Sequence, residues 1–272
     1  MKNLVLLISG RGSNMQAIIQ AARLQQWDVN VCAVIGSRPD APGLAVARDL
    51  GVPAESVSHT EFSGREAFDA ALAEAVSAHR PDVIALCGFM RVLGDAFVAR
   101  FAGRLVNIHP SLLPAFAGLH THKRAIEAGV KWHGATVHLV TADLDHGPIL
   151  AQTVVPVRDG DTPESLSARV LAEEHKIYPQ AVRALLEGRV RVDGMRTRIL
   201  PAAGPSQGGE RPLGGQGAAA TVGANNLPAA GPSQGGEHPL RGQGAAATVG
   251  AGIPPAPATA KSRRGTNKPA SK

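Results

Sequence analysis

The sequence predicts an α/β protein with a doubly wound, mostly parallel sheet, helices on both faces and an antiparallel strand pair late in the chain. Apolar runs of strand length alternate with stretches of helical spacing over residues 1–199, which is the pattern of strand–helix–strand units. The run PDVIALCGF at 81–89 is almost continuously apolar, as expected of a strand covered on both faces. Aromatic residues make up only 3% of the chain, so aliphatic side chains must fill the core.

The expected elements follow one another in order along the chain. Strands are expected at 3–9, 29–37, 81–89 and 105–108, and helices at 13–25, 41–51, 65–79 and 94–104. The segment 134–157 alternates like an antiparallel pair with a turn at its middle. A long closing helix follows, entered by Asp161 or Thr162 and stopped at Gly188.

The composition changes near residue 200. We expect a folded domain at 1–198 and a Gly/Pro/Ala-rich segment at 199–272, which contains two near-identical units that begin at Leu200 and Leu227, a period of 27 residues. These units carry few large apolar residues and many helix and strand breakers, so disorder is expected rather than a solenoid. The basic end, KSRRGTNKPASK, is interpreted as a solvated extension.

Charge and apolar pattern exclude several classes of protein. Residues 201–272 hold seven Lys/Arg and two Glu, a charge of +5 out of the total of +6, so the folded part is nearly neutral and no specific nucleic-acid partner is expected. The sequence contains no apolar run of 18 residues, so no membrane span is predicted. The short apolar run after Met1 indicates a strand rather than a signal peptide. Cys32 and Cys87 lie in apolar runs and are expected to be free thiols of a cytoplasmic protein. We expect small-molecule substrates and a monomer or weak homodimer.

Ligands of doubly wound sheets bind at the carboxyl ends of the strands, which directs attention to the loops after Ser9, Cys87 and Ile108. The first, SGRGSN, lies between a strand and a helix, where glycines and free N–H groups suit a phosphate. A tight turn with Ser13 capping the helix explains it equally well. Met15 stands where a dinucleotide fingerprint needs glycine, and no Gly-Lys-Ser/Thr follows.

The other loops carry polar groups beside apolar ones. CGFMRVLG at 87–94 could line a pocket for a flat ring or belong to the core. In NIHPSLLP, Asn107 offers an amide donor for a developing oxyanion and His109 can carry a proton, although a lone His after a strand is often structural. A carboxylate in TADLDHGP, Asp143 or Asp145, would raise the pKa of an imidazole beside it.

Two other chemistries are not expected. Histidines at 120, 122, 133 and 138 lack Cys or paired acidic partners at zinc spacing, so no metal site is predicted. Cys87 lies in an apolar strand, where a thiolate is disfavoured, so it is not expected to be a nucleophile.

Four loop sequences together resemble the folate-dependent formyltransferases: ISGRGSN, LCGFMRVL, NIHPSLLPAFAGLHTHKRAIEAG and VTADLDHGPIL. HPSLLP is typical of the whole group, and GLHTHKRAIEAG and SGRGSN point to its glycinamide ribonucleotide branch. The resemblance covers about residues 1–195 and excludes the repeated segment.

The resemblance implies transfer of the formyl group of 10-formyltetrahydrofolate, as co-substrate, to the amine of 5-phosphoribosylglycinamide in purine biosynthesis, with no metal. It makes Asn107 the oxyanion donor, His109 the proton donor and shuttle, and Asp145 the carboxylate that polarises this histidine. It also implies contacts to the ribonucleotide by Gly12, Ser13, Asn14 and Glu174, and to the folate by Arg65, Met90, Arg91, Val92, Leu93 and Asn107. Residues 111–131 correspond to a mobile loop over the site.

Another 10-formyltetrahydrofolate-dependent formyltransferase or hydrolase of the same fold is the alternative. Methionyl-tRNA formyltransferase would need a C-terminal β-barrel, which the Gly/Pro-rich segment cannot form. Formyltetrahydrofolate hydrolase would carry an N-terminal regulatory domain, whereas the first expected strand starts at Asn3. A non-catalytic nucleotide-binding module using only the Gly12 loop would leave Asn107, His109 and Asp145 unexplained.

Overall fold

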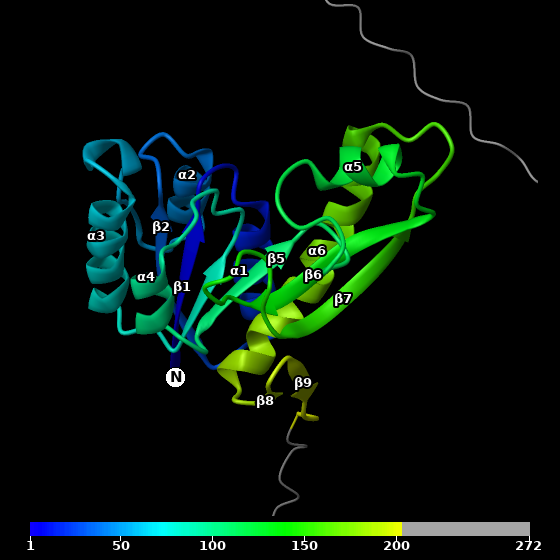
Figure 1. Ribbon diagram of the computed structural model, residues 1–272. Helices are drawn as coiled ribbons and strands as arrows, with labels where there is room; N and C mark the ends of the chain where they lie inside the picture. The colour runs from blue at the N-terminus through cyan, green and yellow to red at the C-terminus, as the bar shows by residue number, and fades with distance from the viewer. Residues whose placement is uncertain (203–272) are drawn as a thin grey trace, which may run out of the picture. The chain divides into compact units, whose positions relative to one another are not determined.

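The computed structural model describes residues 1–202 and places a seven-stranded sheet at their centre. The strand order is β3-β2-β1-β4-β5-β6-β7, with the first five strands parallel and the last two antiparallel to their neighbours. The strands are β1 Lys2–Ile8, β2 Val29–Gly36, β3 Ala54–Ser56, β4 Val83–Leu86, β5 Leu105–His109, β6 Trp132–Leu139 and β7 Ile149–Pro156 (Figure 1). The predicted fold class, including the late antiparallel pair, is confirmed.

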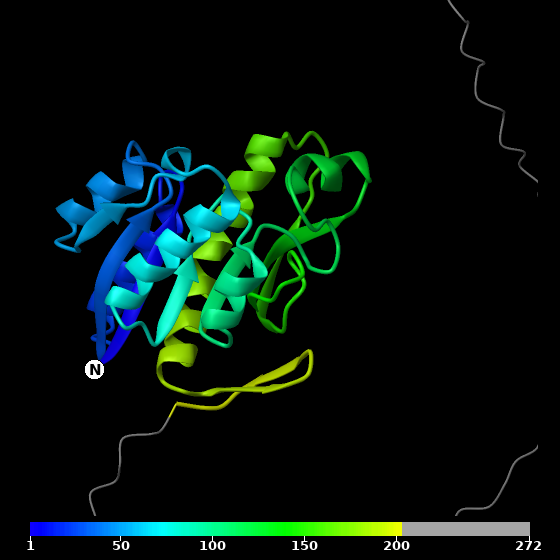
Figure 2. The ribbon, with the colours of Figure 1, turned by 60° about the vertical axis from the view of Figure 1, so that its left-hand side comes forward.

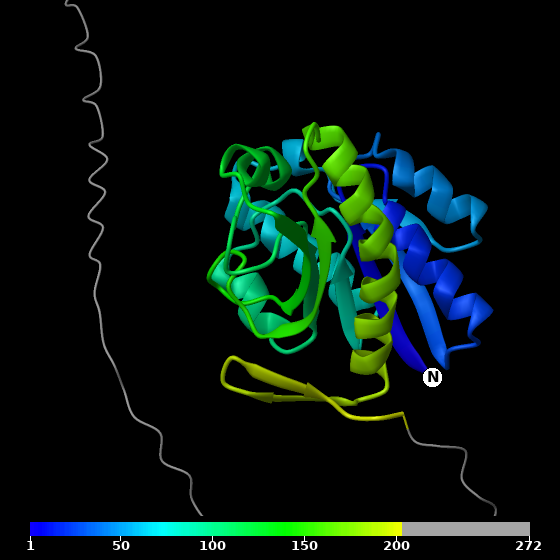
Figure 3. The same ribbon diagram turned by 90° about the vertical axis from the view of Figure 1, so that its right-hand side faces the viewer.

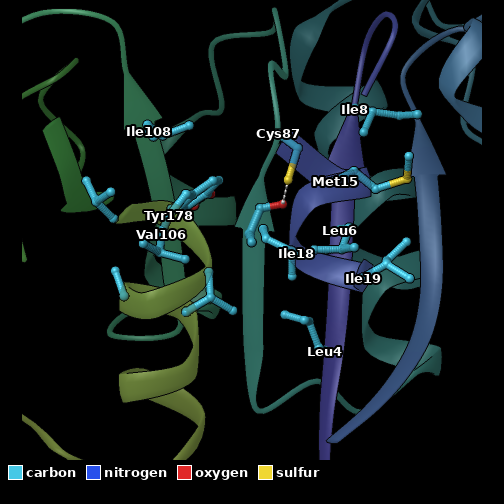
Figure 4. Close-up of a cluster of buried hydrophobic side chains, with 14 of the residues drawn as sticks. Leu4, Leu6, Ile8, Met15, Ile18, Ile19, Cys87, Val106, Ile108 and Tyr178 are labelled. Carbon is cyan, nitrogen blue, oxygen red and sulfur yellow. Dashed lines mark hydrogen bonds between the residues drawn. The ribbon is translucent and has the colours of Figure 1, made fainter. Parts of the chain in front are cut away.

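Helices cover both faces of this sheet (Figures 2 and 3). They are α1 Ser13–Leu24, α2 Pro42–Asp49, α3 Arg65–Ala78, α4 Asp95–Arg100, α5 Thr121–Glu127 and α6 Pro163–Leu186. Alternate residues of β1 point to opposite faces: Leu4 and Leu6 pack in a core with residues of α1, α2 and α6, while Val5 and Leu7 pack with α3 and α4. Figure 4 shows the first of these cores, where Met15 and Ile18 of α1 lie against β1.

The closing helix α6 begins with a capping box. The Thr162 hydroxyl accepts from the Ser165 N–H, and the Ser165 hydroxyl accepts from the Thr162 N–H. Asp161, the other expected entry residue, accepts from the Ser165 hydroxyl and from both ends of the Arg169 guanidinium. Asp161 and Thr162, the two alternatives that the sequence offered, therefore both contribute to the start of α6, and Thr162 is the N-cap residue.

Five short elements were not predicted: β3, the 3₁₀ helix η1 His59–Glu61, α5, and the hairpin of β8 Val190–Asp193 and β9 Arg196–Ile199. The hairpin is largely exposed, so it carries little apolar pattern. Strand β9 ends one residue beyond the expected domain boundary at 198, and the Leu200 N–H donates to the Arg189 carbonyl. The expected disorder of the repeated segment concerns residues 203–272, which lie outside the described residues. Among the helices of residues 1–202, none combines the length and the apolar character that crossing a membrane requires.

Candidate active site

The residues expected to be catalytic lie on β5 and on the loop between β6 and β7. Strand β5 runs to His109, one residue further than predicted, so His109 is a strand residue rather than a loop residue. Val106 and Ile108 pack in the core beneath α1 and α6, and Leu105 packs with α3 and α4. Because side chains alternate along a strand, Asn107 and His109 share the face on which α3 and α4 lie.

His109 is buried and has an acceptor at each ring nitrogen. Its Nδ1 lies 3.4 Å from Oδ2 of Asp145, and its Nε2 lies 3.2 Å from the Phe116 carbonyl oxygen. The Phe116 carbonyl oxygen only accepts, so Nε2 carries the proton of that hydrogen bond. The side chains of His109 and Asp145 are 8% and 9% exposed, which shields this contact from water.

Asp145 also connects His109 to the segment that follows β5. Its Oδ2 accepts from the Gly118 N–H at 2.8 Å, and its backbone is left-handed, with φ of +51°. Of the two aspartates that the sequence offered, Asp145 contacts His109, whereas Asp143 lies 3.9 Å from the exposed His146. The geometry distinguishes two carboxylates that the residue pattern left equivalent.

The Asn107 amide is oriented by an imidazole across the sheet. Asn107 and His138 are paired in the β5–β6 register, and Nδ2 of Asn107 lies 3.3 Å from Nε2 of His138. The other ring nitrogen, Nδ1, lies 3.0 Å from the Leu139 carbonyl oxygen and must donate to it. Nε2 is then free to accept from Asn107, which agrees with the lowered pKa of His138, caused first by its burial. Sequence reasoning considered His138 only as a metal ligand, because the strand register was not known.

The segment after β5 is anchored to the antiparallel strands. The Ser111 hydroxyl donates to the Ala115 carbonyl at 2.7 Å, and the Thr136 hydroxyl donates to the Ser111 carbonyl at 2.7 Å. Gln152 of β7 donates to the Leu113 carbonyl. These contacts occupy the hydroxyl and the carbonyl of Ser111 and hold the start of this segment against β6 and β7.

The glycine loop and α6 bring a second set of expected residues together. Gly12, with φ of +70°, is the cap of α1, and Ser13 is its first helical residue; no side-chain cap is made, so the interpretation of Ser13 as a cap is wrong. Nδ2 of Asn14 donates to Oε2 of Glu174 at 2.7 Å, joining α1 to α6. Burial raises the pKa of Glu174, and the Asn14 hydrogen bond acts against that shift.

The 87–94 loop divides its apolar residues between core and solvent: Cys87 is buried, and Phe89 and Leu93 pack against the core on the side of α3 and α4. Met90 is 67% and Val92 55% exposed, while Leu93 is half-buried. The Met90 N–H donates to the Ser9 hydroxyl at 2.8 Å, which joins this loop to the glycine loop. Arg65, at the start of α3, lines a cleft together with Gly94 at the end of the loop. Arg65 thus lies beside Gly94, the residue that follows Leu93 in the chain.

No cluster of three or more His, Cys, Asp or Glu suited to hold a metal ion occurs in the part of the chain that the structure describes. Cys87 is buried, and burial raises the pKa of its thiol, which is unfavourable for a nucleophile.

Comparison with known proteins places the chain in a family. It matches the formyl transferase family over residues 2–182. Phosphoribosylglycinamide formyltransferase of Escherichia coli is 46% identical over 190 residues, which are 70% of this chain and 90% of that protein. The crystal structure of glycinamide ribonucleotide transformylase 1 from Symbiobacterium toebii is 48% identical, with a TM-score of 0.72 over 74% of this chain and 95% of that one. That of formyltetrahydrofolate deformylase from Burkholderia mallei is 28% identical, with a TM-score of 0.67 over 74% of this chain and 70% of that one.

This chain belongs to the formyl transferase family, and its chemistry is the transfer of a formyl group. The resemblance expected from the four loop motifs is thereby confirmed.

Proposed function

We propose that this enzyme transfers the formyl group of 10-formyltetrahydrofolate to the amine of 5-phosphoribosylglycinamide in de novo purine biosynthesis. The products are formylglycinamide ribonucleotide and tetrahydrofolate. The observation that carries the proposal is the placement of His109 between Asp145 and the Phe116 carbonyl, two residues from the oriented amide of Asn107. This is a proton donor beside an oxyanion donor, which are the two groups that acyl transfer to an amine needs.

The residues divide the reaction between them. The substrate amine attacks the formyl carbon, and negative charge develops on the formyl oxygen. The Asn107 amide donates to that oxygen, because one of its N–H bonds is directed at His138 and the second remains for the substrate. His109 gives a proton to the folate nitrogen that leaves and takes up the proton that the attacking amine loses. Asp145 holds the ring in place for both steps.

Substrate binding is assigned to the loops that surround this centre. Gly12, Ser13 and Asn14 hold the phosphate at the start of α1, where N–H groups favour an anion, and Glu174 binds the ribose or glycinamide part. The loop residues Met90, Arg91, Val92 and Leu93 line the pterin pocket, with Asn107 beside the formyl group and Arg65 at the far part of the folate. The segment 111–131 is a mobile cover over the site.

We also propose the location, the partners and the oligomeric state of the enzyme. Its substrates are small molecules, it acts in the cytoplasm without a metal, and it is a monomer or weak homodimer. It binds no membrane and no specific nucleic acid, since residues 1–200 carry a charge of only +1, the total of +6 less the +5 that follows.

The test is an assay with 10-formyltetrahydrofolate, with and without 5-phosphoribosylglycinamide. We expect formylglycinamide ribonucleotide and tetrahydrofolate in equal amounts, and slow tetrahydrofolate release when the amine is left out. Rapid release of formate without the amine would instead indicate a hydrolase, the activity named for the Burkholderia mallei relative. Absence of formyl transfer to the ribonucleotide would refute the proposal.

A further inference from the structure

Asp69 is a buried carboxylate outside the reacting centre. It lies on α3, one turn after Arg65, and is 6% exposed. Its Oδ2 accepts from the Gly94 N–H at 2.7 Å, while Oδ1 is buried and has no hydrogen-bond partner among residues 1–202. Burial raises the pKa of Asp69, and the Gly94 hydrogen bond and the Arg65 charge act against that shift.

Such a group is unfavourable for stability alone. A buried carboxylate loses its hydration, and an unpartnered oxygen recovers none of that loss. An apolar side chain on this face of α3 would join the core in which its neighbours Phe68 and Leu72 pack together with Phe97 of α4 and Phe101. The carboxylate therefore has a use that packing does not supply.

The position of Gly94 indicates that use. Gly94 ends the 87–94 loop and is the cap residue of α4. A Cβ on Gly94 would lie 3.0 Å from Oδ2 of Asp69 and 3.8 Å from Nε of Arg65. The loop end, the carboxylate and the arginine thus meet at one point, in a cleft of about 500 Å³ between α3 and α4.

We propose that Asp69 is a positioning residue for the folate site, whose carboxylate ties the end of the 87–94 loop to the first turn of α3. This hydrogen bond fixes the position of Arg65 relative to Met90–Leu93, so that both ends of one folate molecule are bound at the same time. This inference rests on the proposed function, because it uses the folate contacts assigned there. Two separated groups of a protein bind one ligand less tightly when the distance between them varies, so a fixed spacing favours folate binding.

The test compares Asp69→Ala with Asp69→Asn and with Glu66→Ala. We expect Asp69→Ala to raise the KM for 10-formyltetrahydrofolate about tenfold, the loss that one buried hydrogen bond of about 1.4 kcal/mol gives. The KM for the ribonucleotide and the kcat should stay within about twofold, which a general loss of structure would not allow. Asp69→Asn should restore most of the affinity, because its amide oxygen can still accept from Gly94. Glu66 is an exposed carboxylate of the same cleft, and its variant should behave as wild type.

Gly94→Ala tests the same contact from the other side. The backbone of Gly94, with φ of −79°, is open to alanine, so the effect comes from the added Cβ and not from strain. The single variant should raise the folate KM, and combining it with Asp69→Ala should add little, since both remove one interaction. Folding of each variant is checked by its thermal unfolding midpoint, and if Asp69→Ala does not fold, Gly94→Ala carries the test alone.

Folate binding without turnover separates this inference from the proposed function. Titration of each protein with a non-reacting 10-formyl folate analogue measures the site directly. A wild type that binds the analogue but transfers no formyl group would refute the function and leave Asp69 testable. Unchanged folate affinity in folded Asp69→Ala or Gly94→Ala would overturn the role of Asp69, as would equal losses for both substrates.

Discussion

The pairing of Asn107 with His138 determines the orientation of the Asn107 side-chain amide. An asparagine side chain can turn either its oxygen or its nitrogen toward a substrate. His138 donates to the Leu139 carbonyl through Nδ1, so its Nε2 accepts and the Asn107 nitrogen must face it. The same nitrogen then has a second N–H bond for an oxyanion. A neutral histidine thus sets which way the Asn107 amide faces.

Replacement of Asn107 tests the oxyanion contact. We expect Asn107→Ala to lower kcat by about 10²–10³, the usual loss for one oxyanion donor, with smaller changes in either KM. The exposed Asn30 of β2, far along the sheet from β5, supplies a matched control as Asn30→Ala. A kcat for Asn107→Ala within threefold of wild type would contradict the assignment.

Because His133 is buried, we expect the stability of the fold to decrease in acid. It is 1% exposed, and its pKa is lowered to about 4, first by burial and then by the neighbouring His122. In the unfolded chain its pKa is about 6.5, so between these values the unfolded state binds a proton that the folded state does not. The free energy of unfolding should therefore fall as the pH drops from about 6.5 to 4, by about 3 kcal/mol in total.

Urea unfolding at several pH values measures this effect. His133→Phe, which keeps a ring against Phe116 and His122, should reduce the loss between pH 6.5 and 4. The same change at the exposed His146 should leave the pH profile as in wild type. An equal loss in His133→Phe and wild type would show that other groups cause it.

At the scale of elements, strands and long helices were predictable, and contacts between them were not. Apolar runs located β1 and β4, and regular spacing located α1 and α6, because burial against a sheet imposes these patterns. The pairing of Asn107 with His138 depends on the β5–β6 register, and the choice of Asp145 over Asp143 depends on a left-handed turn. Asn14 and Glu174 are 160 residues apart, a proximity that only the resemblance to a family implied. The hairpin of β8 and β9 was missed because exposed strands need no apolar alternation.

Tyr178 of α6 holds two of the strands that carry the site. Its hydroxyl, fully buried, lies 2.9 Å from the Leu86 carbonyl oxygen and 3.0 Å from that of Val106, and Figure 4 shows its ring beside Val106. These carbonyls precede Cys87 and Asn107, where the 87–94 loop and the residues proposed for catalysis begin. Tyr178→Phe should lower the free energy of unfolding by about 1–3 kcal/mol, since the one phenolic proton that these two buried carbonyls share is lost. Urea unfolding of the two proteins measures it, and a difference below about 0.5 kcal/mol would argue against the contact.

At the scale of the whole molecule, every residue assigned to the site lies between Gly12 and Glu174. The β8–β9 hairpin closes the described part, and the Thr197 hydroxyl donates to the Ile149 carbonyl of β7. The Leu200 N–H donates to the Arg189 carbonyl, so the folded part needs residues slightly beyond 198. The repeated segment contributes no residue to the proposed chemistry.

Removal of the segment after residue 202 should therefore leave fold and activity intact. We expect the truncated and full-length proteins to share the same thermal unfolding midpoint within about 2 °C, and the same kcat and KM values within about twofold. A truncation after residue 196, which deletes most of β9, serves as the comparison and should be less stable. Loss of soluble, active protein on truncation after 202 would assign the repeated segment a structural role.

The role of His109 in the reaction is tested most directly by the single-turnover rate of formyl transfer, measured for wild type and for His109→Ala with both substrates saturating. We expect a rate about 10²–10⁴-fold lower in the variant, the usual contribution of a positioned acid and base, with substrate binding retained. A His109→Ala protein that transfers the formyl group as fast as wild type would contradict the role of His109 and of the Asp145 contact that holds it.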